Sequence, residues 1–287
     1  MKKIPVKQIA PAHSEQSAAG RFSIRSLEQV MGAGDMMHEL HRHNFYFILA
    51  VEKGSGMHEI DFVKFKVQDH SLFILRPGQV HRLELKAGSK GYLLEFDPAF
   101  YQPKDRISDQ RWKKATGKNY CEVEAARFRK LYSILAMVFG EFTAREEGYA
   151  EAIRANFDLF FIEWIRQSKE PGRTSGSENN YTQDRYEELM RLLETNIGTK
   201  KNVPDYTGLL NLSAYQLNAI TKTTVGKTVS ELINEQIVLE AKRYLLATSS
   251  QVKEIADQLG YEDPSYFVRF FKKQTGFSPE AFRKNFK

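Results

Sequence analysis

Two different periodicities of apolar residues divide this chain of 287 residues. Between residues 21 and 100, short runs of strand-forming residues alternate with turns that contain Gly, Pro or Asp, as in the run 45–51. Short strands at this spacing predict an all-β barrel or sandwich. Beyond residue 182 the apolar residues recur at helical spacing, which predicts an all-helical domain. The predicted fold class is therefore α+β with two domains.

Residues 122–169 have the pattern of two long helices, separated by a break at residues 146–148. The apolar stripe of the first helix includes Leu131, Ile134, Leu135 and Val138. An apolar stripe needs a partner surface. These helices are therefore expected to pack on the barrel of their own chain or on a second copy.

Composition sets the boundaries between the regions. Residues 97–120 contain two prolines and the basic run Arg111–Lys114, so they are predicted to form a connecting loop. Residues 169–181 are rich in Gly, Ser, Pro, Asn and charged residues, which predicts a flexible linker. The chain is divided into a polar arm (1–20), a barrel (21–120), a helical segment (121–168), a linker (169–181) and a helical domain (182–287).

The stretch 252–276 has the pattern of two short helices around a sharp turn. Residues at i, i+3, i+4 and i+7 mark the first helix: Val252, Ile255, Ala256 and Leu259. Gly260 suits the end of that helix, and Asp263 can cap the next one. The second helix has an aromatic face and a cationic face. This is the pattern of a helix-turn-helix, whose second helix fits the DNA major groove, about 12 Å wide.

An earlier stretch, 203–226, repeats this pattern, with Ser213 as the cap of its second helix and Gly226 at the end of that helix. Between the two copies, residues 229–247 are predicted to form one helix of about 28 Å, from the rise of 1.5 Å per residue. Such a strut would hold two recognition helices near one duplex turn apart, about 34 Å.

Specific binding needs phosphate contacts for affinity and base contacts for specificity. Arg269 is the best candidate base reader, because a guanidinium pairs with O6 and N7 of guanine. Ser265 and Tyr266 can reach bases or phosphates, and the further phosphate candidates are Lys272, Lys273 and Arg283. The outward residues of the earlier copy are Tyr215, Gln216, Asn218 and Lys222. That copy either reads adenine through Asn218 or Gln216, or only braces the domain and touches phosphates.

The run from Gly260 to Arg283, G-Y-x-x-x-S-Y-F-x-R-x-F-K-K-x-x-G-x-S-P-x-x-F-R, resembles the second helix-turn-helix of AraC-type (AraC/XylS) transcription regulators. The resemblance implies a sequence-specific, double-stranded DNA-binding regulator with an N-terminal sensor barrel. It also implies that the helices of residues 121–168 make a homodimer contact. The earlier copy departs from the family, because Ala219 stands where Arg is frequent and Thr221 stands where an aromatic residue is frequent.

Two segments of the barrel, His41-Arg-His43 and Pro77–His81, resemble the two motifs of cupins, which are double-stranded β-helix barrels. Strand parity places the candidate pocket residues on inward faces: His41, His43, Phe45, Phe47 and His81. Three imidazoles could bind a metal, form a hydrogen-bonded structural set, or line a metal-free pocket for a small polar effector of unknown identity. Phe47 and Leu85 stand where metal-binding cupins usually place polar ligands, so no metal and no cofactor is expected.

Charge and composition add a little to this picture. The formal net charge is +6, and from Asp263 onward six Lys and Arg stand against two acids. The one cysteine excludes an intramolecular disulfide and fits a reducing compartment. No stretch approaches the roughly 20 apolar residues of a membrane span, and no signal peptide is evident. We therefore expect a cytoplasmic, ligand-responsive transcription regulator that is not an enzyme; the alternative is a cupin metalloenzyme with a helical appendage.

Overall fold

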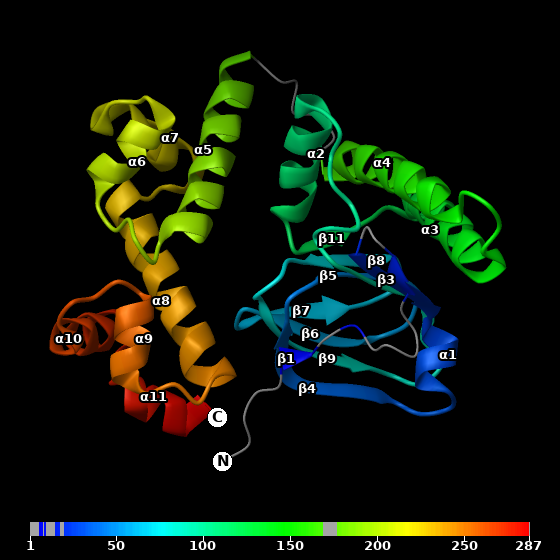
Figure 1. Ribbon diagram of the computed structural model, residues 1–287, viewed down its shortest axis with the longest axis horizontal. Coiled ribbons are helices and arrows are strands. Elements are labelled where there is room, and N and C mark those ends of the chain that lie inside the picture. The colour runs from blue at the N-terminus through cyan, green and yellow to red at the C-terminus, as the bar shows by residue number, and fades with distance from the viewer. Residues whose placement is uncertain (1–5, 8, 10–14, 18–19, 169–176, 287) are drawn as a thin grey trace. The chain divides into compact units, whose positions relative to one another are not determined.

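The computed structural model describes residues 6–7, 9, 15–17, 20–168 and 177–286 (Figure 1). The chain divides into two compact units, one spanning Pro5–Gly172 and the other built mainly from Arg173–Lys287. The predicted α+β class is confirmed, because the first unit contains all the described strands and the second unit contains only helices among its described residues.

The strands of the first unit form two sheets that face each other (Figure 1). In sheet order, the six-stranded sheet consists of β11 (Tyr120–Glu122), β8 (Ser71–Leu75), β5 (Tyr46–Lys53), β10 (Lys90–Phe96), β3 (Gly20–Ser26) and β2 (Glu15–Ser17). The five-stranded sheet consists of β1 (Val6–Lys7), β4 (Met36–His43), β9 (Val80–Leu85), β6 (Gly56–Ile60) and β7 (Val63–Val67). A short helix, α1 (Leu27–Met31), follows β3. This arrangement confirms the predicted barrel.

One hydrophobic core fills the space between the two sheets. Its buried members include Phe45, Phe47, Phe73, Leu83 and Leu93. All of these except Phe45, which lies between β4 and β5, come from strands of both sheets, because alternate residues of each strand point to the same face. The five-stranded sheet keeps its other face in contact with solvent, where the Met37 side chain is 69% exposed.

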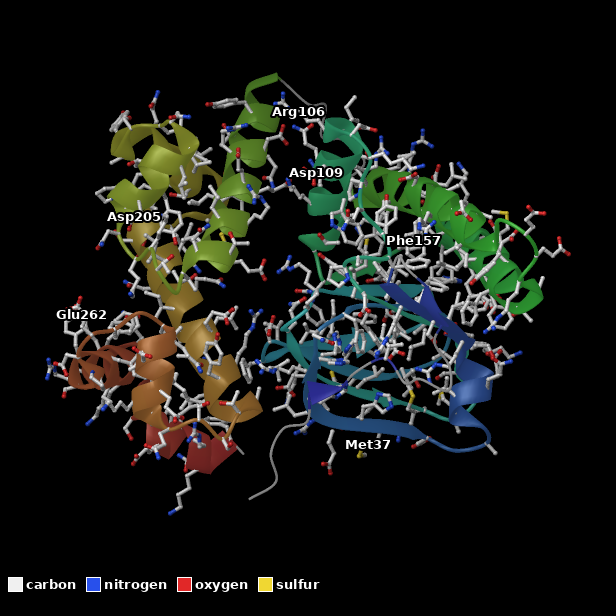
Figure 2. All side chains as sticks on the ribbon, in the orientation of Figure 1. Met37, Arg106, Asp109, Phe157, Asp205 and Glu262 are labelled. Atoms are coloured by element: carbon white, nitrogen blue, oxygen red, sulfur yellow. The ribbon has the colours of Figure 1, made fainter. Side chains whose placement is uncertain are left out.

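A second core covers the outer face of the six-stranded sheet. Three helices supply it: α2 (Arg106–Thr116), α3 (Ala125–Ala144) and α4 (Tyr149–Ser168). Strand β8 and the centre of β5 are therefore buried on both faces, and every residue of β8 is buried. Phe157 of α4, labelled in Figure 2, is fully buried against Phe22 and Phe96 of the sheet.

The helical break at residues 146–148 is confirmed. Of the two partners expected for the apolar stripe of the first helix, the structure shows the barrel of its own chain. A dimer contact through the stripe is wrong, because four of its residues are buried inside their own unit: Leu131, Ile134, Leu135 and Val138. The expected connecting loop is also wrong. The segment expected to be a connecting loop contains α2. Its buried Trp112 packs against Tyr46 and Phe161, at ring-centroid distances of 4.7 Å in both cases.

The second unit contains seven helices among its described residues. They are α5 (Ser177–Asn196), α6 (Val203–Leu210), α7 (Ala214–Val225), α8 (Val229–Ala247), α9 (Val252–Gln258), α10 (Pro264–Thr275) and α11 (Pro279–Phe286). Figure 1 shows α6 and α7 toward one end of α8, and α9, α10 and α11 toward the other. The two predicted helix pairs and the helix that joins them are confirmed.

Parts of two expected regions fall outside the described residues. In the expected arm (1–20), the described strands β1 and β2 pair with β4 and β3, so these parts belong to the sheets. Of the expected linker (169–181), residues 169–176 lie outside the described residues, and Ser177 already begins α5. In the described part of the chain, no helix combines the length and the apolar character needed to cross a membrane.

Candidate nucleic-acid interface and effector site

The second helix-turn-helix presents α10 with one buried and one exposed face. Asp263 caps the helix by accepting a hydrogen bond from the Ser265 backbone N–H at 2.8 Å, and this bond holds the pKa of the carboxyl below its usual value. Gly276 ends the helix in the left-handed conformation, with φ of 81°. Phe267 and Phe271 are fully buried. The exposed face carries the predicted contact residues Ser265, Tyr266, Arg269, Lys272 and Lys273.

Arg269 projects into solvent from the middle of this exposed face. Its side chain is 70% exposed, and its Nη2 atom lies 4.0 Å from Oδ2 of Asp263. The guanidinium carbon lies 6.0 Å from the centroid of the Tyr266 ring. These contacts at the surface are weak, so Arg269 can exchange them for contacts with a base.

The first helix-turn-helix presents α7 in the same way. Ser213 caps the helix, and Oε1 of Gln216 accepts a hydrogen bond from the Ser213 backbone N–H at 2.9 Å. Leu217 is fully buried, whereas Tyr215 is 85% exposed and Lys222 is exposed. The exposed face of α7 therefore carries fewer cations than that of α10.

Two of the predicted contact residues make side-chain hydrogen bonds beyond their own helix. Asn218 uses both ends of its amide: Nδ2 donates to the Ala214 carbonyl at 3.0 Å, and Oδ1 accepts from the Val229 backbone N–H at 3.0 Å. This bond ties α7 to the first residue of α8.

Arg283 of α11 is the second of these residues. It donates from Nε to the Leu245 carbonyl at 3.0 Å and from Nη2 to the Ser250 carbonyl at 2.6 Å. The guanidinium therefore satisfies carbonyl groups around the end of α8, which have no partner within that helix.

Figure 2 marks the two motifs by Asp205 on α6 and Glu262 in the turn before α10. Their recognition helices belong to one compact unit and both contact α8. A helix of this length spans about 28 Å. This arrangement is suited to a duplex whose grooves recur every turn, at about 34 Å.

The predicted histidines lie together inside the barrel. The ring centroid of His81 lies 4.3 Å from that of His41 and 5.0 Å from that of His43. Phe47 lies against the same group, 5.2 Å from His81, and Phe45 stacks on His43 at 4.3 Å. All five residues are at most 3% exposed.

The sequence-based prediction missed a fourth imidazole, that of His58 on β6. Its Nε2 atom lies 2.9 Å from Nδ1 of His81. His58 stands two residues before the inward Ile60, so strand parity places both on the same face. This spacing was the available signal. The pairing of β6 with β9, which brings the two rings together, could not be read from the pattern.

Hydrogen bonds and burial fix the state of this histidine group. Nδ1 of His41 donates to the Glu39 carbonyl and Nδ1 of His43 to the Phe45 carbonyl, each at 2.8 Å. Burial lowers the pKa of His58 to about 3, helped by the neighbouring His43 and His41, and burial likewise lowers the pKa of His81 well below its ordinary value. Both rings are therefore neutral at physiological pH. In the described ranges, no group of three or more His, Cys, Asp or Glu is arranged to hold a metal ion.

The buried polar side chains of the barrel strands are few. Among the described strand residues they are Ser23, His41, His43, His58, Ser71 and His81, and none of these is a carboxylate, Lys or Arg. The interior is therefore largely apolar and aromatic. Its main polar groups are these imidazoles and the Arg25–Glu95 ion pair, which joins β3 and β10 at 3.0 Å with side chains 26% and 15% exposed.

A sensor-like barrel and a unit with two exposed recognition helices define a helix-turn-helix DNA-binding protein. Two family models match the chain: "Helix-turn-helix domain" over residues 206–285 and "AraC-like ligand binding domain" over residues 29–112. The chain belongs to the AraC family of helix-turn-helix transcription regulators and carries the family's ligand-binding domain. This family membership places the chain among regulators and not among cupin metalloenzymes.

Two curated proteins and one solved structure are among those to which the chain is similar. The chain is 24% identical over 255 residues to the transcriptional activator RhaS of Pectobacterium carotovorum, covering 85% of this chain and 86% of that protein. It is 31% identical over 97 residues to the transcriptional regulator YisR of Bacillus subtilis, covering 34% of each chain. The structure of ToxT from Vibrio cholerae with bound unsaturated fatty acid is 17% identical, with a TM-score of 0.42 over 94% of this chain and 96% of that one.

Proposed function

We propose that α7 and α10 enter successive major grooves of one DNA duplex, and that a small molecule bound in the barrel controls this binding. One observation carries the proposal: both helices are capped, bury their apolar faces, and present polar and aromatic side chains to solvent from one compact unit. A protein that acts in this way on a bacterial chromosome works in the cytoplasm.

The residues divide into contact residues and bracing residues. We assign DNA contacts to Tyr215, Gln216, Lys222, Ser265, Tyr266, Arg269, Lys272 and Lys273. Asn218 and Arg283 have bracing roles, because their side chains bond to other helices of the unit. Arg269 is the principal base reader, since a guanidinium can donate two parallel hydrogen bonds to guanine. Lys272 and Lys273 contribute affinity by neutralising phosphates.

Selection of bound duplexes from a random pool tests the DNA-binding proposal. The purified full chain should enrich sites with two short blocks whose centres lie about one helical turn apart. One conserved block would show that only one recognition helix reads bases. A pool without sequence enrichment would overturn the proposal.

The barrel proposal concerns a ligand of a defined chemical class. The interior offers neutral imidazoles among aromatic and aliphatic side chains, and the charges of Arg25 and Glu95 on its inward faces already neutralise each other at 3.0 Å. Burying an unpaired charge is strongly unfavourable. The effector is therefore an uncharged molecule with an apolar body and a group that bonds to imidazole.

Thermal unfolding with a panel of uncharged sugars and phenols tests this ligand class. Tryptophan fluorescence is the specific signal, because the two tryptophans of the chain, Trp112 and Trp164, both lie in the barrel unit. A ligand of the site should raise the unfolding midpoint of the parent but not that of His81→Phe. It should also change the affinity for the selected duplex. A panel that shifts no midpoint, or that shifts both proteins equally, contradicts the proposal.

We also propose that the chain acts as a homodimer through the outer faces of α3 and α4. Their inner faces cover the barrel, but Met137 of α3 and Leu159 of α4 are 49% and 51% exposed. Large apolar side chains on adjacent helices favour a protein partner. A second copy of the chain accounts for them, because two recognition units bound together gain affinity for a paired site.

A further inference from the structure

The loop between α5 and α6 contacts both helix-turn-helix motifs. On the side of the first motif, Oη of Tyr206 donates to the Lys200 carbonyl at 2.7 Å. The Asn202 backbone N–H donates to Oδ2 of Asp205 at 3.1 Å, which joins the loop to the start of α6. Tyr206 is fully buried in the core of the unit. The loop is therefore anchored to the first motif.

On its other side the same loop contacts the turn of the second motif. Nζ of Lys201 donates to the Gly260 carbonyl at 2.5 Å and lies 5.0 Å from the centroid of the Tyr261 ring. The two backbones also meet directly. A Cβ atom at Gly260 would lie 2.1 Å from the Gly198 carbonyl oxygen. We call this set of contacts, Gly198 and Lys201 with Gly260 and Tyr261, the clasp.

The clasp continues into the recognition helix of the second motif. The Tyr261 ring lies 5.4 Å from that of Phe267 and 6.1 Å from that of Phe270, both on α10. Tyr261 and Phe270 also pack against the hydrophobic core that contains Leu217 of α7. Helix α10 is thus attached to the first motif along its side as well as through α8.

Charges from both motifs converge on Lys201. Asp205 of α6 and Glu262 of the turn before α10 both favour its charged form, against partial burial of the side chain, which lowers its pKa. Figure 2 labels these two acids, one in each motif. The Lys201 ammonium therefore interacts with groups from both motifs, as expected for a residue that holds them together.

A second attachment point matters because the two grooves differ in direction as well as position. Each base pair inserted between two sites moves them by about 3.4 Å and rotates them by about a tenth of a turn. A single connecting helix sets a distance, but bending and twisting about it leave the angle less constrained. Contacts at two separate places define both the distance and the angle between the two recognition helices. Rigid linkage of two binding elements makes affinity depend sharply on the geometry of their sites.

We propose that the clasp fixes the angle between α7 and α10, and that Lys201 thereby determines the spacing between the two DNA blocks that this protein accepts. The inference rests on the proposed function, in which both helices read one duplex. Lys201 is a positioning residue in this scheme, since it acts through Gly260 and Tyr261 and not through DNA.

The test uses the full chain and a series of duplexes that carry the selected blocks at the native spacing, or with one base pair added or removed. We expect the parent to lose about tenfold or more in affinity when the spacing changes, and Lys201→Ala to lose less than about threefold. Lys200→Ala is the matched control, because it removes a neighbouring cation that makes none of the clasp contacts. Lys201→Arg should restore spacing dependence, since a guanidinium can also donate to the Gly260 carbonyl.

The outcomes separate the clasp from the function on which it rests. A parent that binds all spacings equally overturns the proposal that both helices read one duplex. A parent that discriminates, with Lys201→Ala discriminating equally well, overturns the clasp. Lys201→Met keeps the apolar stem and removes the charge. It is measured in parallel, after circular dichroism has established that each variant is folded at the assay temperature. If Lys201→Ala or Lys201→Met does not fold, the spacing dependence of the other variant decides whether the clasp sets the spacing.

Discussion

Nε2 of His58 lies 2.9 Å from Nδ1 of His81 inside the barrel, and neither ring is accessible to solvent. The pKa of His58 is lowered to about 3, against about 6.5 for a histidine in an unfolded chain. Between these values the unfolded chain binds a proton that the folded barrel excludes. The contribution of the neutral His58 ring to the free energy of unfolding is therefore fully present above about pH 6.5 and is lost as the pH falls toward 3.

We expect the free energy of unfolding of the barrel unit to fall by about 1.4 kcal/mol per pH unit for each such histidine. The diagnostic range is pH 6.5 to 5, in which exposed carboxylates stay ionised. Replacement of both rings, His58→Leu with His81→Leu, should flatten this slope, whereas His70→Asn, outside the cluster, should keep it. Urea unfolding followed by tryptophan fluorescence gives the slopes. A parent with no slope in this range would contradict the assigned neutral state.

The exposed position of Arg269 leads to a prediction about sequence preference. Arg269→Ala should weaken binding to the selected duplex by about 1–3 kcal/mol and relax the preference at one base pair. Lys253→Ala removes an exposed cation from α9 of the same motif and should leave the preference unchanged. Gel shifts with a set of single-base variants of the site measure the affinity and the base preference of each protein. If Arg269→Ala keeps the parental preference, Arg269 is not a base reader.

The lysines at the end of α10 should act through phosphates. For Lys272→Ala and Lys273→Ala, the slope of log affinity against log salt should decrease in magnitude by about 0.9 for each phosphate that is no longer neutralised. The decrease in affinity should be similar for every DNA sequence. An unchanged slope in both variants would remove these residues from the interface.

Arg283 should behave differently from these lysines, because its guanidinium bonds to the Leu245 and Ser250 carbonyls. Arg283→Met should lower the free energy of unfolding of the helical unit by about 1–3 kcal/mol, the usual cost of leaving buried acceptors unsatisfied. The salt slope of the folded variant should match that of the parent. A changed slope without a loss of stability would return Arg283 to the phosphate contacts.

Two glycines with positive φ should differ in their response to substitution. Gly276 has φ of 81°, and a Cβ atom added there would meet no other atom within 4 Å, so Gly276→Ala should cost about 1 kcal/mol. Gly260 has φ of 70°, and its Cβ would meet the Gly198 carbonyl oxygen, so Gly260→Ala should cost about 3 kcal/mol or more. Denaturant unfolding by circular dichroism compares them. Equal losses of stability in the two variants would show that the backbones of Gly198 and Gly260 do not meet.

The dimer proposal predicts the effect of charge on an apolar surface. Met137→Asp with Leu159→Asp should shift the chain from dimer to monomer at micromolar concentration, because a buried carboxylate without a partner is strongly unfavourable. Met37→Asp is the matched control, since Met37 is exposed on the opposite sheet of the barrel. Sedimentation velocity distinguishes the species. A parent that is monomeric at all concentrations, or a double variant that remains dimeric, would refute this interface.

The helix-turn-helix motifs could be predicted because their signals are local. Ser213 and Gly226 mark the ends of α7 within a few residues of the apolar positions that define it. Helix α2 gave a weaker signal, because its inner face relies on one large apolar residue, Trp112, beside small ones such as Ser108. The capping box of Asp105 with Ser108 was its only clear mark in the sequence.

The roles of several side chains depend on approaches between distant segments and could not be predicted. Asn218 and Arg283 have the polarity and helical placement of DNA-contacting residues, but their partners lie 11 and more than 30 residues away. The sequence left two partners open for the apolar stripe of α3 for a related reason. An apolar face such as that of Leu135 shows that a helix needs a partner, but not which surface provides it.

The unequal exposure of the two sheets has a practical consequence for studying this protein. In β8 and the centre of β5, residues on both parities are buried, so a random library should yield few folded clones with polar changes there. The outer face of the five-stranded sheet should tolerate many. Cys121 is buried and burial raises the pKa of its thiol, so Met37→Cys would offer a reactive dye a single exposed thiol. A fluorophore attached there would report on the barrel without disturbing its interior.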